Sequence, residues 1–339
     1  MQRRSFRIRK AGSLKNLKLV TENIDKPGPN EVCIEIKAIG LNFADIFTIL
    51  GLYRAAPKED FIPGLEFCGV IIEKGENVTE LELNDNVIGV VRFGAFTTHL
   101  NLDYRYLIKL PEGWSFEEGA SFIVQALTAY YALRQLGNLS LNQTVLIHSA
   151  AGGVGIYANR IAKKFSAFTI GTIGNVSKTE LLKSEGYDEI IVRNKNFKKE
   201  LEQKLNGRQL DLIIDMVGGK YQKKSFDLLT TTGRLVAVGL SQFVSHNNTP
   251  NYLKLAIQYI LMPRYHTLKL IESNKSVLGF NLIWLYDRVD LLRKMLDSII
   301  ELHLQKPFVG KVFEFEQLTD AIKLFQSGKT TGKVVVKKY

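Results

Sequence analysis

The stretch Thr144–Gly155, which reads TVLIHSAAGGVG, decides the fold of this chain. Its first part, Thr144–His148, is a short apolar run typical of a buried strand, and a helical pattern begins at about Gly155. Glycines at such a junction let the backbone approach a pyrophosphate. The start of the helix then presents free N–H groups and the positive end of its dipole to the anion. The stretch therefore predicts a dinucleotide-binding strand–loop–helix unit.

Within the loop, Gly152 and Gly153 have no Cβ and leave room for a phosphate. Gly155 allows the helix to pack closely on the sheet, and Ala150 stands where the GxGxxG pattern has its first glycine. We predict that Ala150, Gly152, Gly153 and Val154 contact the cofactor. The alternative is a tight turn that binds no ligand.

The sequence shows two different patterns of apolar residues, one before and one after residue 124. Up to residue 124, short alternating runs such as Val32–Ala38 and Asn86–Val91 predict strands joined by turns. From Gln125 onward, strands alternate with helices, which predicts an α/β unit with a doubly wound parallel sheet. Its later strands are predicted at Phe168–Thr172, Glu189–Val192, Leu210–Asp215 and Arg234–Gly239. We expect residues 125–275 to form this unit, inserted into a β-rich unit built from residues 1–124 and 276–339.

The end of the second strand of the sheet indicates which dinucleotide binds. NAD enzymes usually carry an Asp or Glu there to bond the ribose 2′-hydroxyl. Here Ile170–Asn175 has no carboxylate, and the first one to follow is Glu180. Gly174 leaves room, while Lys178 and Arg193 supply positive charge for a 2′-phosphate, so NADPH is the predicted cofactor. The alternative for both cations is an ordinary solvated side chain.

Further cofactor contacts are expected just beyond the carboxyl ends of the other parallel strands. These positions are Val217 after the fourth strand, Val238, Gly239 and Leu240 after the fifth, and Phe280 and Asn281 after the sixth.

The amino-acid composition limits the class of protein but does not identify its binding partner. The 339 residues hold 45 Lys and Arg against 34 Asp and Glu, a net charge of +11. That surplus favours anionic partners, and nucleotides, nucleic acids and membranes all qualify. No nucleic-acid-binding motif is present, so we expect no nucleic-acid partner. The chain has no secretory signal, no membrane-spanning stretch and only two cysteines, Cys33 and Cys68, which together predict a cytoplasmic protein.

One segment concentrates both positive charge and apolar side chains. Between Asp227 and Glu272 there is no acidic residue, and within this interval Tyr252–Met262 is apolar around most of its helical circumference. Such a helix is usually buried. We expect it to cover the active site or pack in a dimer; weak contact with an anionic membrane surface is the alternative.

Several segments resemble the medium-chain dehydrogenase/reductases, and the resemblance covers almost the whole chain. They are Gly40–Asp45, Gly51–Tyr53, Pro63–Val70 and Ala150–Gly155. The resemblance implies a Rossmann doubly wound sheet inserted into a GroES-like catalytic domain, and a homodimer. Within the family, the sequence is similar to the zinc-independent quinone oxidoreductases, and most of all to the branch of synaptic-vesicle membrane protein (vesicle amine transport) homologues. Quinone oxidoreductases often have Tyr where Arg193 stands here.

The resemblance also implies that no metal is bound. Zinc-dependent members have Cys, Ser or Thr, and His where this chain has Asn42, Ala44 and Leu65, and its five histidines are scattered. Without zinc to polarise a carbonyl, hydride transfer suits acceptors that are already electrophilic. The predicted function is therefore NADPH-dependent reduction of quinones or α,β-unsaturated carbonyls. The alternative is a catalytically weak NADPH-binding protein that works in regulation or at a vesicle or membrane surface.

The same resemblance suggests the residues around the acceptor. Asn42 and Tyr53 are the candidates for positioning the substrate and donating to its oxygen, although Tyr53 as a plain pocket wall is an equal alternative. Asp45 is expected to brace the loop. Thr128 and Lys333 correspond to family positions that contact the cofactor.

Overall fold

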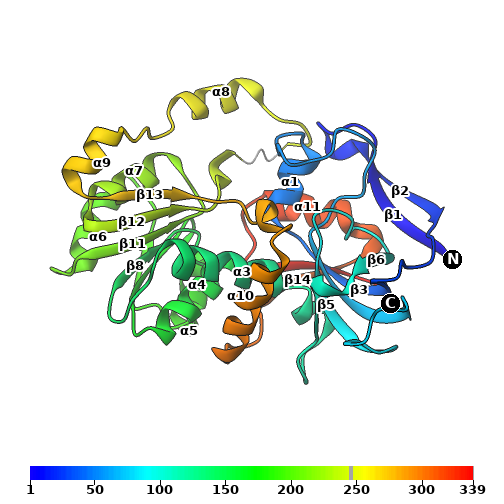
Figure 1. The fold of residues 1–339 in the computed structure, drawn as a ribbon. Coiled ribbons are helices and arrows are strands. Elements are labelled where there is room, and N and C mark those ends of the chain that lie inside the picture. The colour runs from blue at the N-terminus through cyan, green and yellow to red at the C-terminus, as the bar shows by residue number, and fades with distance from the viewer. Residues whose placement is uncertain (244–246, 339) are drawn as a thin grey trace.

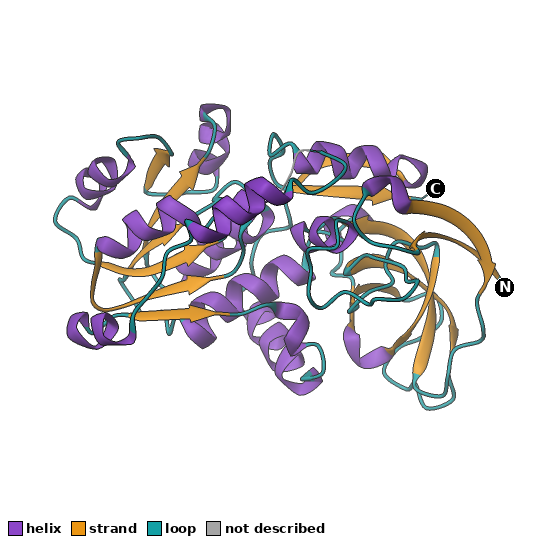
Figure 2. Ribbon diagram, turned by 90° about the horizontal axis from the view of Figure 1, so that it is seen from above, coloured by secondary structure: helices purple, strands orange, loops and turns teal. Residues whose placement is uncertain are grey.

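The computed structural model describes residues 1–243 and 247–338, which form two lobes beside each other (Figure 1). One lobe is a parallel sheet with helices on both faces. The other is β-rich and carries both ends of the chain. Figure 2 shows the strands of each lobe from above, with the helices packed around them.

The first lobe is built on a six-stranded sheet in the order β10-β9-β8-β11-β12-β13, with every neighbouring pair parallel. Its strands are β8 (Thr144–Ile147), β9 (Phe168–Ile173), β10 (Glu189–Val192), β11 (Leu210–Asp215), β12 (Leu229–Ala237) and β13 (Ser276–Gly279). The order reverses at β8, because β9 lies on one side of it and β11 on the other. The predicted doubly wound α/β fold is confirmed, and its switch point lies at the end of β8, where ligands bind in such sheets.

Helices cover both faces of this sheet (Figure 1). They are α3 (Ile123–Tyr130), which continues as a π-helix over Tyr131–Leu136, α4 (Gly153–Lys164), α5 (Thr179–Ser184), α6 (Phe197–Leu205), α7 (Gly219–Asp227) and α10 (Val289–Glu301). The apolar strand residues are almost fully buried, with Val145, Leu146 and Ile147 at 0% exposure. This burial on both faces is what a continuous apolar strand predicts.

The second lobe holds a seven-stranded sheet in the order β14-β15-β3-β4-β5-β7, with β6 paired to β3, and a separate hairpin. Its strands are β1 (Gln2–Ile8), β2 (Leu17–Asn23), β3 (Glu31–Gly40), β4 (Glu66–Lys74), β5 (Asn86–Val90), β6 (His99–Asp103), β7 (Leu107–Lys109), β14 (Val309–Glu314) and β15 (Lys333–Lys337). Its helices are α1 (Phe43–Ile49), α2 (Phe116–Gly119) and α11 (Leu318–Gln326). Because β15 pairs with β3, the C-terminal segment completes a sheet that the N-terminal segment begins.

The structure differs from the sequence expectations in the last quarter of the chain. The parallel sheet extends to Gly279, past the boundary expected after residue 275. The last strand of the sheet ends at Gly279, and Leu282–Leu285 is a 3₁₀ helix. There the Trp284 N–H donates to the Asn281 carbonyl at 3.1 Å and turns the chain toward α10.

The segment between Asp227 and Glu272, which holds no acidic residue, also differs from the expectation of a buried helix. It forms α8 (Tyr252–Ile260) and α9 (Thr267–Ser273), and α8 lies above the parallel-sheet lobe on the side toward the β-rich lobe (Figure 1). None of its residues is buried, and Leu253 and Leu261 are 75% and 72% exposed. The helix is thus not buried in a core, but Leu255 and Tyr259 line the cavity between the lobes, which agrees with the expectation that this segment covers the site. No helix in the described part of the chain is long and apolar enough to cross a membrane.

Candidate active site

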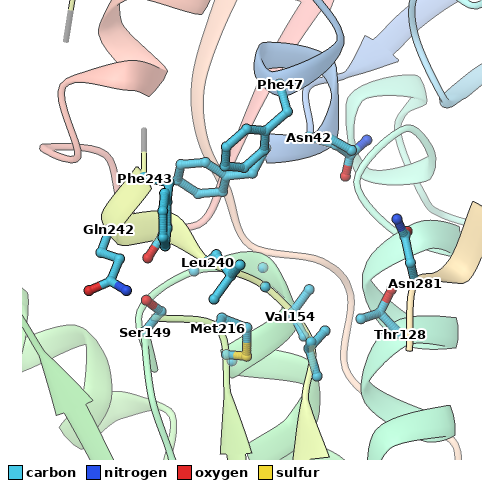
Figure 3. Close-up of a pocket in the computed structure, with 18 of the residues that line it drawn as sticks. Asn42, Phe47, Thr128, Ser149, Val154, Met216, Leu240, Gln242, Phe243 and Asn281 are labelled. Atoms are coloured by element: carbon cyan, nitrogen blue, oxygen red, sulfur yellow. The ribbon is translucent and has the colours of Figure 1, made fainter. Parts of the chain in front are cut away.

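A cavity of about 1770 Å³ lies between the two lobes and draws its lining from both. It is larger than the ~300–1,000 Å³ typical of small-molecule sites. Its walls include the loop after β8, the ends of β9, β11 and β12, part of α1, and the segment around Asn281. Figure 3 shows the amide side chains of Asn42 and Asn281 on one side of this cavity, with Phe47 and Phe243 on the other.

The glycine loop is shaped for close approach to an anion. Gly152 precedes α4 and gives it no side-chain cap, so the first-turn N–H groups of the helix need another acceptor. Gly152, Gly153 and Val154 all line the cavity, and their predicted contact with the cofactor stays a prediction. A Cβ on Gly155 would lie 2.7 Å from the Ala150 Cα, which explains why only glycine fits there. Ala150 itself is fully buried under the helix and is not among the lining residues, so it supports the loop from behind.

The predicted 2′-phosphate residues come together at the end of β9. Gly174, Lys178 and Arg193 all line the cavity. The Lys178 Nζ donates to the carbonyls of Gly328 at 2.8 Å and Thr330 at 2.7 Å, which ties this lobe to the loop before β15.

Arg193 is the second cation at this place. Its Nη1 donates to the Thr172 hydroxyl at 3.1 Å, and its guanidinium lies over the Tyr221 ring. Burial lowers the pKa of Lys178, and the positive charge of Arg193 lowers it further. Neither cation makes an ion pair in the part of the chain that the structure describes. Two adjacent, partly buried cations without a carboxylate fit a phosphate well.

The charge of the whole lining supports the same ligand. Every charged side chain along the described wall of the cavity is a cation, and none is a carboxylate. They are Arg92, Lys178, Arg193, Lys254, Lys329 and Lys333. Two of them are neutralised by carboxylates, since Arg92 pairs with Asp287 at 2.7 Å and Lys333 pairs with Glu66. The remaining charge favours an anionic ligand such as a phosphorylated dinucleotide.

The ends of the other strands contribute as expected, with one exception. Val238, Gly239, Leu240, Phe280 and Asn281 line the cavity, but Val217 does not, and Met216 takes its place. The reason is the buried Asp215 carboxylate, which accepts from the Val217 N–H at 2.9 Å and folds that turn inward.

Asn42 lies at the centre of a buried polar network behind the cavity wall. Its Nδ2 donates to the Glu66 Oε1 at 2.9 Å and to the Gly40 carbonyl at 3.3 Å. Its Oδ1 accepts from the Gln125 Nε2 and from the Lys333 Nζ, each at 2.9 Å. Both Nδ2 hydrogens are therefore engaged, so the predicted donation from Asn42 to a substrate oxygen requires one of these bonds to break.

Lys333 serves this network as well. Its side chain is only 4% exposed, and its ammonium pairs with the Glu66 carboxylate, which is fully buried. Burial lowers the pKa of Lys333, and the charge of Glu66 opposes that shift. Lys333 reaches the lining, but its charged group points into the network. Its expected role as a cofactor contact becomes that of a brace.

Asp45 braces the start of α1, as expected. Its Oδ2 accepts from the Asn42 N–H at 2.7 Å. Burial raises the pKa of Asp45 to about 7, although nearby Lys333 pulls it down.

Tyr53 provides a hydroxyl at the polar side of the cavity. Its Oη donates to the Asn281 Oδ1 at 2.8 Å and so joins the β-rich lobe to the segment after β13. Burial raises the pKa of Tyr53 to about 12, which keeps the hydroxyl protonated at neutral pH. Thr128 of α3 lies near Asn281 (Figure 3). Tyr53, Thr128 and Asn281 thus form a polar corner of the cavity that can meet a carbonyl oxygen.

Sequence reasoning missed two groups of lining residues. The first is Gln125, the one polar amide in the otherwise apolar run Ile123–Ala126, and that contrast is a signal of a buried polar role. The second is Phe243 and its neighbour Gln242, which lie before α8 and for which no charge or glycine pattern gives a signal.

The described residues contain no group of three or more His, Cys, Asp or Glu side chains that could hold a metal ion. His148 illustrates why, since it is buried between the hydroxyls of Thr172 and Ser225 at 2.8 and 2.9 Å. Burial lowers the pKa of His148 to about 4.

Two family models match the chain. Residues 28–112 match the alcohol dehydrogenase GroES-like domain, and residues 186–336 match the zinc-binding dehydrogenase domain. The synaptic vesicle membrane protein VAT-1 homologue of zebrafish is 33% identical over 310 residues, covering 90% of this chain and 64% of that protein. The human VAT-1 homologue is 31% identical over 313 residues, covering 91% of this chain and 79% of that protein. The chain thus spans just under two thirds of the zebrafish relative.

Solved structures share the same architecture over the full length. The CurK enoyl reductase superposes with a TM-score of 0.85 at 27% identity, covering 100% of both chains. A quinone oxidoreductase of Pseudomonas syringae pv. tomato superposes with a TM-score of 0.83 at 25% identity, covering 99% of both. With both lobes, the glycine loop and the interlobe cavity in place, this chain belongs to the medium-chain dehydrogenase/reductases, a superfamily of oxidoreductases, and is related within it to the VAT-1 homologues.

Proposed function

We propose that the protein is an NADPH-dependent reductase of quinones or α,β-unsaturated carbonyls. The observation that carries the proposal is the pair Lys178 and Arg193, which lie beside the glycine loop in a cavity whose charged lining is entirely cationic in the described residues. A pyrophosphate at the loop and a 2′-phosphate at this pair would match that charge. NADH, which lacks the 2′-phosphate, would leave the two cations unmatched.

The residues of the cavity would hold the reactants as follows. The dinucleotide supplies a hydride from C4 of its nicotinamide when bound. The walls at Val238, Leu240 and Phe280 would hold that ring, and the apolar lining would keep water away. The polar corner at Tyr53 and Asn281 would receive the carbonyl oxygen of the acceptor.

The reaction balances without a further reagent. For an enone, the hydride forms a C–H bond at the β-carbon as the C=C π bond breaks, and negative charge moves to the carbonyl oxygen. The Tyr53 hydroxyl, which its pKa of about 12 keeps protonated, would donate to that oxygen by giving up its hydrogen bond to the Asn281 Oδ1. A proton from solvent at the α-carbon would then complete the saturated ketone.

The acceptor class is supported by two neighbours of the same fold. One is named an enoyl reductase and the other a quinone oxidoreductase. Enones and quinones are already electrophilic, so their reduction suits a cavity whose charged and polar side chains, rather than a metal, would meet the carbonyl oxygen.

The test is a steady-state assay of NADPH oxidation with a panel of quinones and enones. We expect turnover with at least one acceptor, and a kcat/KM at least about tenfold lower with NADH, since a charge-assisted hydrogen bond contributes ~1.5–3 kcal/mol. The matched control is Tyr53→Phe, which keeps the pocket wall and removes the hydroxyl. Protein that binds NADPH but turns over no acceptor in the panel would overturn the proposal.

A second candidate function is favoured by the outer surface of α8 and α9. Leu253, Ile260, Leu261, Leu268 and Ile271 are all between 65% and 75% exposed. Cations lie among them, with no acidic residue from 228 to 271. An exposed apolar helix with nearby cations suits the surface of an anionic membrane.

This membrane-surface role predicts co-sedimentation with phosphatidylserine-containing liposomes at low salt, and weaker sedimentation with neutral ones. Leu253→Glu should reduce the bound fraction several-fold. Absence of binding to anionic liposomes at low salt would contradict the role without touching the reductase proposal.

A further inference from the structure

The cavity has a third part beyond the cofactor loop and the polar corner. Figure 3 shows the rings of Phe47 and Phe243 away from the Asn42 and Asn281 amides, and the lining also includes Leu255, Tyr259 and Met262. This part is apolar, and the reaction outlined above assigns nothing to it.

The roof of this third part is α8, and it is fastened at both ends. Before the helix, the Leu14 N–H donates to the Asn248 carbonyl at 2.9 Å, which ties it to the β-rich lobe. Within it, the Gln258 Nε2 donates to the Gln242 carbonyl at 2.8 Å. After it, the Tyr265 ring packs edge-on against a phenylalanine of α7, with 4.6 Å between the ring centroids. The helix is therefore held across the cleft.

The two faces of α8 have different surroundings. Leu255 is half-buried and lines the cavity, whereas Leu253 is 75% exposed and is not among the lining residues. Among the lining residues of α8, Lys254 is the only charged one. The inner face is therefore mainly apolar, with one cation and two tyrosines, and a mainly apolar face beside Phe47 and Phe243 can bind a hydrocarbon chain.

We infer that this third part is a tail site, and that the physiological acceptor is an amphiphile with an electrophilic carbonyl head group and a long apolar chain. The head would lie at the polar corner and the chain under α8, against Phe243, Leu255 and Met262. This inference rests on the proposed reductase function and specifies its substrate class. A tailed quinone and a long-chain enone both satisfy it.

The test compares one benzoquinone head group with and without a decyl chain. Binding of each to the full-length protein saturated with NADP⁺ is measured by calorimetry, and NADPH oxidation by each is measured in parallel. Each methylene moved from water into an apolar site favours binding by up to about fourfold, so burial of four methylenes gives roughly 200-fold. We expect the decyl compound to bind at least about 50-fold more tightly, with a negative heat-capacity change.

Two matched variants test which face of α8 the decyl chain of the ligand contacts. Leu255→Glu puts a charge into the tail site. It should reduce the affinity advantage of the decyl compound over the short quinone at least about tenfold. Leu253→Glu makes the same change on the outer face and should leave the gain intact. Leu255→Trp fills the site without a charge and should also reduce the gain. All three should bind NADPH and the short quinone like the wild type, which shows that they are folded.

The outcomes separate the tail site from the reductase function. A gain of less than about threefold in the wild type, or an equal loss in Leu253→Glu and Leu255→Glu, overturns the tail site. Turnover of both quinones without a gain from the chain leaves the reductase function standing and removes the tail site. Tight, Leu255-dependent binding of the decyl compound without any NADPH oxidation would support the tail site and contradict the reductase function.

Discussion

Replacing Lys333 by Met should destabilise the protein strongly, because it leaves a buried carboxylate without its cation. The Lys333 side chain is 4% exposed and that of Glu66 is 0% exposed, so water cannot replace the lost partner. Breaking a buried ion pair from one side costs about 3–5 kcal/mol. Glu66 keeps hydrogen bonds from the Asn42 and Gln125 amides, at 2.9 and 2.8 Å, which offset part of that loss. We therefore expect about 3 kcal/mol.

The assay is urea unfolding followed by tryptophan fluorescence, with two comparison variants. Lys338→Met breaks a pair with Glu35 in which both side chains are more than 20% exposed, and should cost less than about 1 kcal/mol. The double variant Lys333→Met with Glu66→Gln removes both charges and should recover at least about half of the loss. A loss below about 1 kcal/mol for Lys333→Met, or no recovery in the double variant, would refute the reasoning that this pair is an essential brace.

Three further predictions address the loop, the cofactor pair and pH. Lys178→Met should weaken NADPH binding about 10- to 100-fold in calorimetry while changing NADH binding less than about threefold; equal losses would show that Lys178 does not meet the 2′-phosphate. Gly155→Ala should lower the free energy of unfolding by about 1–3 kcal/mol, because its Cβ would lie 2.7 Å from the Ala150 backbone, and a neutral result would mean that the helix can shift. Burial raises the pKa of Asp45 from an unfolded value of 3.8 to about 7. The folded state therefore keeps this proton longer, and its contribution to stability, complete below pH ~4, disappears as the pH rises to ~7. Relative to Asp45→Asn, the wild type should lose stability between pH ~4.5 and ~7.5 in urea titrations, a comparison that cancels the opposite effect of His148; a constant difference would contradict the assignment.

The sequence was most informative where backbone chemistry fixes the structure. The apolar strand before Gly152 and the alternation of strands and helices after it were enough to predict the parallel sheet. Beyond the loop, Gly174, Lys178 and Arg193, chosen because no carboxylate follows β9, all line the cavity, and their role at a 2′-phosphate stays a prediction. These features depend on local rules, so one chain suffices to find them.

The remaining features depend on contacts between distant segments. Lys333 looks like a free cation in the sequence, and only the pairing of β15 with β3 brings it to Glu66. Val217 looks like a strand-end contact, but the Asp215 carboxylate turns it inward. The apolar pattern of Tyr252–Met262 predicts burial in general and cannot show that a cavity lies beneath the helix. The homodimer and the cytoplasmic location stay predictions.

The most direct test of the central claim follows deuterium from NADPH that is labelled at either face of C4. A site that holds the nicotinamide against its acceptor must transfer hydride from one face only. We predict that, with an accepted quinone or enone, one epimer gives unlabelled NADP⁺ with a primary isotope effect and the other epimer retains all of its label. Equal loss of label from both epimers, or no oxidation above the protein-free rate, would contradict hydride transfer in this cavity.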